Sequence, residues 1–187
     1  MVDISFNSTT TMMLRDIIGK TLDLFCCDRF EFSPCVFGIV GFKIERTFYK
    51  LTCNLEKTTR FWSEDEIVQL RFEECGSQKP KSRMDGGAMI DTPVHDTIVK
   101  IDLINDLESV AFENEQRTLY STKGIIFHLS SGNEISFELD TWFSEMITIQ
   151  RGYGLIDRFT TVDDFLEERE DCEGYKATVE RRIVSLK

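Results

Sequence analysis

The feature that most constrains the fold is the stretch 124–139, where apolar and polar residues alternate on both sides of a turn. Apolar side chains occupy every second position before the turn (Ile125, Phe127, Leu129) and again after it (Ile135, Phe137, Leu139). Successive side chains of a strand point to opposite faces. The turn residues Ser130-Ser131-Gly132-Asn133 separate the two runs. The stretch therefore predicts an antiparallel β-hairpin with one apolar face and one solvated face.

Other segments show similar strand-like patterns. We expect strands at 20–25, 36–42, 47–54, 67–72, 98–104, 146–151 and from 175 to the end of the chain. Residues 12–25 fit both helical and alternating spacing, and we favour a strand for 20–25. Gly38 and Gly41 lie inside one apolar run and indicate a bulge or a close backbone approach. Thr161, followed by Asp163 and Asp164, is a good N-cap for a short helix.

Two parts of the chain resemble each other. Phe61-Trp62-Ser63-Glu64 is answered by Trp142-Phe143-Ser144-Glu145, and Leu22-Asp23-Leu24 by Ile101-Asp102-Leu103, in the same order and at offsets of 79 to 82 residues across all matched segments. This self-similarity predicts a duplicated β-rich unit. The alternative is that amphipathic strands resemble one another by chance. The aromatic residues of the two corners are expected to pack in the core, with an exposed aromatic ligand platform at Trp62 or Trp142 as the alternative.

The predicted fold class is therefore β-rich α+β, with antiparallel sheets in two similar halves and one or two short helices. The first half spans 1–75 and the second 96–187, and the second carries the short acidic helix and the C-terminal strand. Between them, 76–95 is rich in glycine and proline and is expected to be a loop or linker. With 187 residues the two halves can share one core.

Charge narrows the range of partners. The net charge is −11 and the pI is about 4.7. Such a chain repels phosphate backbones, so direct nucleic-acid binding is not expected. The charge suits a basic protein partner, although it also serves solubility alone.

The expected cellular compartment follows from the lack of a signal peptide, a membrane span and a CxxC pair in the sequence. The N-terminus shows no basic start followed by an apolar run, and no window approaches the ~20 apolar residues of a membrane span. Six cysteines occur without a CxxC pair. We expect reduced thiols in a cytoplasmic protein that contacts no membrane.

No established catalytic or metal-binding motif is present, so we expect no cofactor, no metal and no catalytic residues. The enzyme hypothesis that remains centres on His95 with Asp91 or Asp96 as its partner. A thiolate pair of Cys26 or Cys27 with His95 is conceivable, but inert buried thiols are the better interpretation.

The loop between the halves offers a ligand-binding alternative. Its cations and glycines could cradle a small anion or a nucleotide, which would make the protein a binder or sponge for such ligands. The residues concerned are Lys79, Lys81, Arg83, Gly86 and Gly87. A solvated surface loop is the simpler interpretation.

The densest charge in the sequence is acidic and lies near the C-terminus. It comprises Asp163, Asp164, Glu167, Glu168, Glu170 and Asp171. The cluster suits either the solvated face of a short helix or a surface that attracts a basic protein. Our leading hypothesis is a non-enzymatic acidic binding protein of bacterial or phage type. It would act as an immunity or counter-defence inhibitor that masks a basic, nuclease-like partner.

Overall fold

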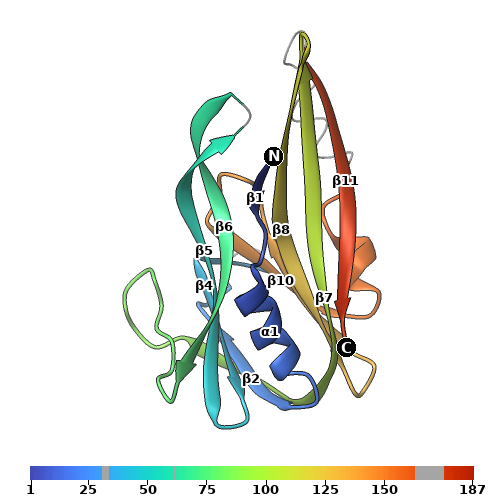
Figure 1. Ribbon diagram of the computed structural model, residues 1–187. Helices are drawn as coiled ribbons and strands as arrows, with labels where there is room; N and C mark the ends of the chain where they lie inside the picture. The colour runs from blue at the N-terminus through green and yellow to red at the C-terminus, as the bar shows by residue number, and fades with distance from the viewer. Residues whose placement is uncertain (31–33, 61, 163–174) are drawn as a thin grey trace.

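The computed structural model of the 187-residue chain describes residues 1–30, 34–60, 62–162 and 175–187. The described residues form eleven strands, a short α-helix and one turn of 3-10 helix (Figure 1). The strands are β1 (Val2–Ile4), β2 (Thr21–Cys27), β3 (Cys35–Phe37), β4 (Ile39–Ile44), β5 (Thr47–Arg60), β6 (Ser63–Gly76), β7 (Ile90–Phe112), β8 (Glu115–Leu129), β9 (Glu134–Leu139), β10 (Met146–Gly152) and β11 (Tyr175–Leu186). The helices are α1 (Ser8–Asp16) and η1 (Leu155–Arg158). The β-rich α+β class is confirmed.

The predicted strands are present, and several are longer than the sequence indicated. The hairpin at 124–139 is confirmed, because Phe127 of β8 pairs with Ile135 of β9 across the expected turn. The strand expected at 98–104 is part of the 23-residue strand β7. The outer ends of β7 and β8 were missed, because polar residues such as Asn105 interrupt the apolar alternation there.

The two sheets are joined at two places, by one shared strand and by one direct connection between strands. Sheet A contains β3, β10, β9, β8, β7 and β11, and the short β1 pairs with β8 in parallel. Sheet B contains β7, β2, β4, β5 and β6. Strand β7 belongs to both sheets, and β3 of sheet A continues directly into β4 of sheet B through Gly38. Strand pairing and this β3–β4 connection together close a circuit, from which β5–β6 extend on one side and β11 on the other.

The first corner of this circuit lies in β7. Residues 90–97 pair with β2, and the strand continues into sheet A from Ile98. The register shift leaves Val94 and His95 opposite the single residue Asp23, and His95 adopts a φ of 53°. Such a β-bulge bends a strand and also accommodates Pro93. Residues 90–95, expected to belong to a loop, are thus part of a strand, and the irregular segment spans only 77–89.

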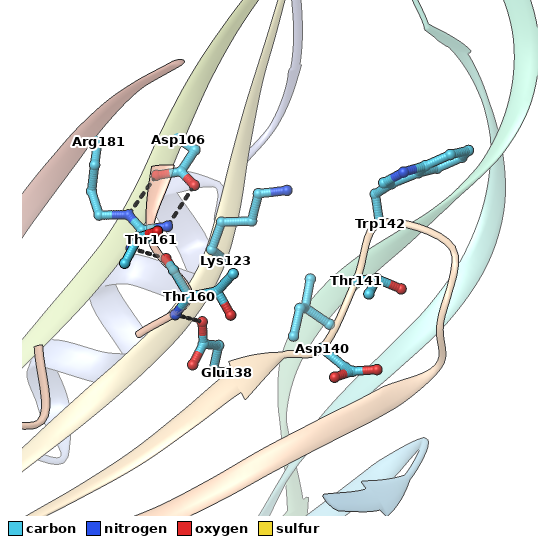
Figure 2. Close-up of a pocket in the computed structure, with 10 residues that line it drawn as sticks. Asp106, Lys123, Glu138, Asp140, Thr141, Trp142, Thr160, Thr161 and Arg181 are labelled. Atoms are coloured by element: carbon cyan, nitrogen blue, oxygen red, sulfur yellow. Dashed lines mark hydrogen bonds and ion pairs between the residues drawn. The ribbon is translucent and has the colours of Figure 1, made fainter. Parts of the chain in front are cut away.

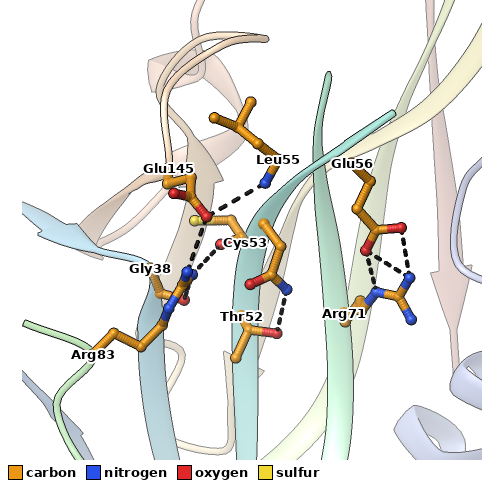
Figure 3. A network of polar contacts seen from close by, with 9 residues as sticks. Gly38, Thr52, Cys53, Leu55, Glu56, Arg71, Arg83 and Glu145 are labelled. Atoms are coloured by element: carbon orange, nitrogen blue, oxygen red, sulfur yellow. Dashed lines mark hydrogen bonds and ion pairs between the residues drawn. The ribbon is translucent and has the colours of Figure 1, made fainter. Parts of the chain in front are cut away.

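The second corner lies at Gly38, between β3 and β4 (Figure 3). Its φ of 71° lies in the left-handed region that favours glycine. Arg83 reaches this corner from the 77–89 loop, and its Nη1 donates to the carbonyl oxygens of Cys53 at 2.6 Å and Gly38 at 3.4 Å. Its Nη2 lies 3.0 Å from Glu145 Oε1 in the β9–β10 connection. One guanidinium therefore joins three segments around the bend.

One main core fills the space between the two sheets. Phe42 of β4 lies at its centre, with ring centroids 4.9 Å from Phe137 and 5.5 Å from Phe127 of sheet A and 5.9 Å from Phe72 of sheet B. Such aromatic pairs contribute about 0.5–1.5 kcal/mol each beyond their burial. Both predicted halves thus contribute to one hydrophobic cluster.

Helix α1 contributes to the same core. It is capped by Asn7, whose side chain accepts from the Thr10 backbone N–H at 2.9 Å, and Leu14 buries its apolar face. Within the part of the chain that the structure describes, the helices are too short and too polar to cross a bilayer.

The expectation of a solvated outer face on the hairpin is wrong. Ser136 and Glu138 of β9 are 2% and 5% exposed, because η1 and its flanking residues lie over this face. Leu155 and Phe159 of this cover pack against Ile104 and Ile126 as a second, small apolar cluster. We call residues 153–160 the cover segment. An apolar cluster on each face explains why β9 is buried on both sides.

The duplication stays a prediction. Both halves contain a four-stranded antiparallel meander, β2-β4-β5-β6 in one and β7-β8-β9-β10 in the other. The repeated aromatic sequences fall at the β5–β6 turn and at the β9–β10 connection. A common strand order is shared by many unrelated sheets, so it does not establish a repeat. The helix expected from Thr161 lies, from 163 on, outside the described residues.

The Gly38 corner yields a stability prediction with a matched control. A Cβ at Gly38 would lie 2.6 Å from Arg83 Nη1, whereas a Cβ at Gly76 would meet nothing within 4 Å, although both glycines have positive φ (71° and 61°). We expect Gly76→Ala to cost about 1–2 kcal/mol of unfolding free energy for its backbone conformation alone. Gly38→Ala should cost about 1–3 kcal/mol more, because the new methyl group displaces Arg83.

Urea unfolding of the two variants measures this difference. Adding Arg83→Ala to both backgrounds should bring the cost of the two glycine substitutions together. An equal cost in the presence of Arg83 would show that the guanidinium does not constrain the corner.

Candidate functional site

The outer face of sheet A carries a row of buried carboxylates. Asp102, Asp106 and Glu108 lie at even positions of β7, so they share one face, and they are 7%, 4% and 1% exposed. A buried carboxylate needs a cation or several hydrogen-bond donors. Each of these three lies beside a basic side chain contributed by β7, β8 or β11. We call this row, with its partners, the ionic face.

At one end of the ionic face, Asp102 collects three donors. Ser185 Oγ of β11 donates to it at 2.6 Å, Lys100 Nζ lies 2.8 Å away, and His128 Nε2 of β8 lies 2.7 Å away. Burial alone would raise the pKa of Asp102, but these hydrogen bonds outweigh it and hold the pKa below its ordinary value. His128 Nδ1 lies 3.1 Å from Glu134 Oε1, so both ring nitrogens are engaged.

This geometry does not assemble a nucleophile. Ser185 bonds the carboxylate of Asp102 and not the imidazole of His128. A serine nucleophile requires a base within hydrogen-bond reach of its own hydroxyl. The Ser185–Asp102–His128 group is therefore a structural network that ties three strands together.

In the middle of the ionic face, Arg181 of β11 makes a bidentate ion pair with Asp106. Its Nε and Nη2 each lie 2.8 Å from a carboxylate oxygen, and its Nη1 donates to the Thr160 carbonyl at 2.7 Å. These interactions raise the pKa of Arg181 above its ordinary value. The bidentate contact arises because the fork of the guanidinium matches the two oxygens of a carboxylate. On β8, Lys123 Nζ lies 3.1 Å from Glu108 Oε1.

Two carboxylates of β9 hold the cover segment in place. Glu134 Oε2 accepts from the Leu155 N–H at 2.7 Å, and Glu138 Oε1 accepts from the Thr160 N–H at 2.8 Å. Burial raises the pKa of Glu138, although the Thr160 hydrogen bond opposes this. The polar residues of β9, expected to face solvent, thus bind the backbone that covers them.

A small cavity lies beside the Asp106–Arg181 pair (Figure 2). Its volume is about 60 Å³, which accommodates a few water molecules, whereas small-molecule sites occupy about 300–1,000 Å³. Thr141 Oγ1 lines it and has no hydrogen-bond partner among the described residues. A water molecule is the ligand that this space and this hydroxyl can take. The cavity is too small to enclose a substrate.

A larger groove lies where β3, the 77–89 loop and the start of β7 meet. Its volume is about 730 Å³, and its lining comprises Asp28, Arg29, Cys35, Val36, Phe37, Ser82, Met84, Asp85, Ala88, Ile90 and Met146. Met84 and Ile90 are 72% and 52% exposed. Ser82 Oγ donates to Asp28 at 3.0 Å, and the Gly87 N–H donates to Asp85 at 2.7 Å. We call this the Met84 groove. It offers apolar surface bordered by acids.

The residues of the proposed anion cradle are largely engaged within the protein. Lys79 pairs with Asp91, and Arg83 binds the Gly38 corner. The Gly86 N–H donates to the Ser82 carbonyl, and the Gly87 N–H to Asp85. Lys81 is exposed and forms an isolated β-bridge with Ala88. The anion-binding hypothesis stays a prediction, and thermal unfolding in the presence of nucleotides tests it.

The residues of the enzyme hypothesis are not assembled. His95 is exposed at the bend of β7, whereas Asp96 binds Ser130 and the Ser131 N–H, and Asp91 pairs with Lys79. Burial raises the pKa of Cys26 to about 11 and that of Cys27 to about 12, so both are protonated thiols at neutral pH. Five cysteines of the described residues are free. No cluster of metal-binding side chains occurs in the described ranges.

The acidic cluster predicted to bind a partner lies outside the described residues at each of its positions: Asp163, Asp164, Glu167, Glu168, Glu170 and Asp171. The sequence reasoning missed both the ionic face and the Met84 groove. The sequence shows the polar residues of β7 and β9 alternating with apolar ones, but the side chains that pair with them depend on strand register. The groove joins segments about 50 and 110 residues apart in sequence, which no local pattern indicates.

Comparisons with protein-family models, with characterised proteins and with solved structures find no significant match to this chain. The function must therefore be argued from the two surfaces described above.

Glu138 generates a pH prediction. Its pKa is raised in the folded state, so the folded chain holds this proton to higher pH than the unfolded chain does. As pH rises above the ordinary value of 4.5, the unfolded state deprotonates first, and the wild-type protein loses stability over that window. Glu138→Gln keeps an acceptor oxygen for Thr160 and removes the titration. We expect its stability relative to wild type to be higher at neutral pH than below pH 4.5.

Urea unfolding across this pH range measures the difference between the two proteins. Glu66→Gln, the same substitution at an exposed position of β6, is the matched control. If the difference in unfolding free energy between wild type and Glu138→Gln were constant with pH, burial would not raise the pKa of Glu138 as described.

Proposed function

We propose that this chain is a non-enzymatic binding protein that masks a basic, nuclease-like protein, in the manner of an immunity or counter-defence inhibitor. The observation that carries the proposal is the Met84 groove, which combines exposed apolar side chains with acids. Asp28 and Asp85 line it, and no lysine or arginine of the described residues forms an ion pair with either. A partner segment with a hydrophobic anchor and flanking lysines or arginines complements such a lining.

The charge balance of the rest of the surface supports the same partner. Ten lysine and arginine side chains of the described residues form ion pairs with Asp or Glu of the same chain. The net charge of −11 therefore belongs to acids in excess of these pairs. An excess of one sign steers an oppositely charged protein and increases its association rate. Arg29 is the one cation among the lining residues of the groove, which leaves that lining acidic overall.

The groove is better suited to a protein partner than the ionic face is. The ionic face is neutralised from within, and its cavity is too small for a substrate. The 730 Å³ groove is open and lined mainly by apolar side chains, which suits a protruding peptide segment.

A panel of purified basic nuclease domains, with acidic proteins of similar size as controls, tests this function by biolayer interferometry. We expect binding to one or more basic domains. The affinity should fall between about 50 and about 200 mM salt, because charge contributes to the encounter. Equal binding to acidic and basic proteins, or binding to none, would contradict the proposal.

The position of the interface is tested by a charge reversal with a matched control. Asp28→Lys/Asp85→Lys changes the groove, and Asp16→Lys/Asp157→Lys makes the same change in net charge at exposed positions elsewhere. We expect the groove variant to bind at least about tenfold more weakly than the control variant, which corresponds to about 1.4 kcal/mol. An equal loss in both variants would show that net charge alone governs binding.

The acidic cluster stays a second predicted contact. Reversing Glu167, Glu168, Glu170 and Asp171 to lysine is its direct test, read against the same basic domain. Weaker binding would add the cluster to the interface, and unchanged binding would remove it and leave the groove as the docking surface.

A further inference from the structure

Strand β11 lies at one end of sheet A among the described strands. It pairs with β7 along its whole length, from Tyr175 opposite Phe112 to Leu186 opposite Ile101. No other described strand pairs with β11. An unpaired edge presents a row of backbone N–H and C=O groups that can pair with another strand. Native proteins usually shield such edges, yet Ile183 and Val184 here are 50% and 39% exposed.

The sequence of this edge is complementary to itself. If two copies of β11 run antiparallel about a two-fold axis at Arg181, Glu180 of one copy faces Arg182 of the other, and Val179 faces Ile183. Residues that face each other across an antiparallel pair share a face of the sheet. In this register an acid therefore meets a base, and an apolar residue meets an apolar residue, on both sides of the axis. Moving the axis to Arg182 would instead place Glu180 opposite Val184.

We propose that β11 is a dimerisation edge, at which a second copy of this chain adds its own β11 in antiparallel orientation. The two copies of sheet A then form one continuous sheet across a two-fold axis. This inference does not depend on the proposed function, because the Met84 groove is formed by other elements.

The charges at the axis are already arranged for this contact. Within each strand, Arg182 and Glu180 form a bidentate pair at 2.8 and 3.0 Å, and both side chains are exposed. In the dimer the four side chains alternate in sign, so each arginine lies between two carboxylates. Arg181 faces its own counterpart, but Asp106 neutralises each copy through two 2.8 Å contacts.

A second copy is a better occupant than an unrelated acidic or basic strand. Two chains of net charge −11 repel each other, so they associate best where each is least acidic. Strand β11 is such a place, since it carries Lys176, Arg181 and Arg182 against the single acid Glu180. A pair of single strands is a small interface, and we expect a dimer with a dissociation constant of about micromolar order.

Dimerisation also brings two copies of the ionic face together. The axis passes between the two Arg181 residues, so the two Asp106–Arg181 pairs lie next to each other on one side of the joined sheet. The buried Asp106–Arg181 pair therefore holds β11 against β7 in each copy, and it also neutralises the Arg181 charge at the two-fold axis.

Sedimentation equilibrium of the full chain, from about 1 to about 100 μM, tests the proposal. We expect the wild-type protein to change from monomer to dimer over this range. Arg182→Glu places two acids opposite each other and should weaken the dimer at least about tenfold. The exchange Glu180→Arg/Arg182→Glu restores opposite charges in both the strand and the dimer, and it should return the affinity to the wild-type value.

Lys50→Glu, which disrupts the Lys50–Glu73 pair at 2.9 Å on the other sheet and makes the same change in net charge as Arg182→Glu, is the matched control and should leave the dimer unchanged. Circular dichroism establishes that each variant is folded. If Arg182→Glu fails to fold, Ile183→Lys, which removes an exposed apolar contact, should also favour the monomer. A wild-type monomer at the highest concentration, or a dimer insensitive to both substitutions, would overturn the inference. Loss of the dimer in Lys50→Glu would show that net charge, or another edge, governs the dimer.

Discussion

The joining of two sheets at two bends, one inside β7 and one between β3 and β4, is the constraint on which the rest of this structure depends. Strand β7 bends at His95, and the β3–β4 run bends at Gly38, so the pairing closes around one aromatic core. Each bend depends on backbone in the left-handed region, which is costly for most residues. Hydrogen bonds from distant segments hold the bends. Arg83 binds the Gly38 corner, and Asp96 binds Ser130 beside the β7 bend.

This arrangement explains which features the sequence could predict. Strand alternation is local, so the hairpin 124–139 and most strand cores follow from the order of the residues. A bend within a strand is encoded differently. Pro93 and His95 resemble a loop because their neighbours break the alternation, yet pairing with β2 on one side makes the segment a bulged strand. The position of Gly38 could be predicted as a close approach, but the guanidinium of Arg83 that approaches it could not.

The candidate site was less predictable than the fold, for a physical reason. Asp102, His128 and Ser185 come from three strands, and they meet only because the strand registers place them together. The Met84 groove likewise joins β3, the 77–89 loop and β10. Composition did predict the sign of the surface, since the excess of acids is independent of register. It did not predict that the polar face of β9 would be covered, because Leu155 and Phe159 are apolar residues in a segment without strand or long-helix pattern.

The distribution of charge also separates the charged groups that stabilise the fold from those that a partner protein can contact. On the ionic face the buried carboxylates are held by cations and hydrogen-bond donors of the same chain, and such groups are costly to disturb once buried. They are therefore poorly suited to capture a partner, which would have to replace existing contacts. Asp28 and Asp85 in the Met84 groove and the Glu180–Arg182 pair on β11 are different, because a partner can meet them without first removing a buried ion pair. An apolar side chain beside each of these charges, Met84 in the groove and Val184 on β11, supplies the burial that exposed charges alone do not.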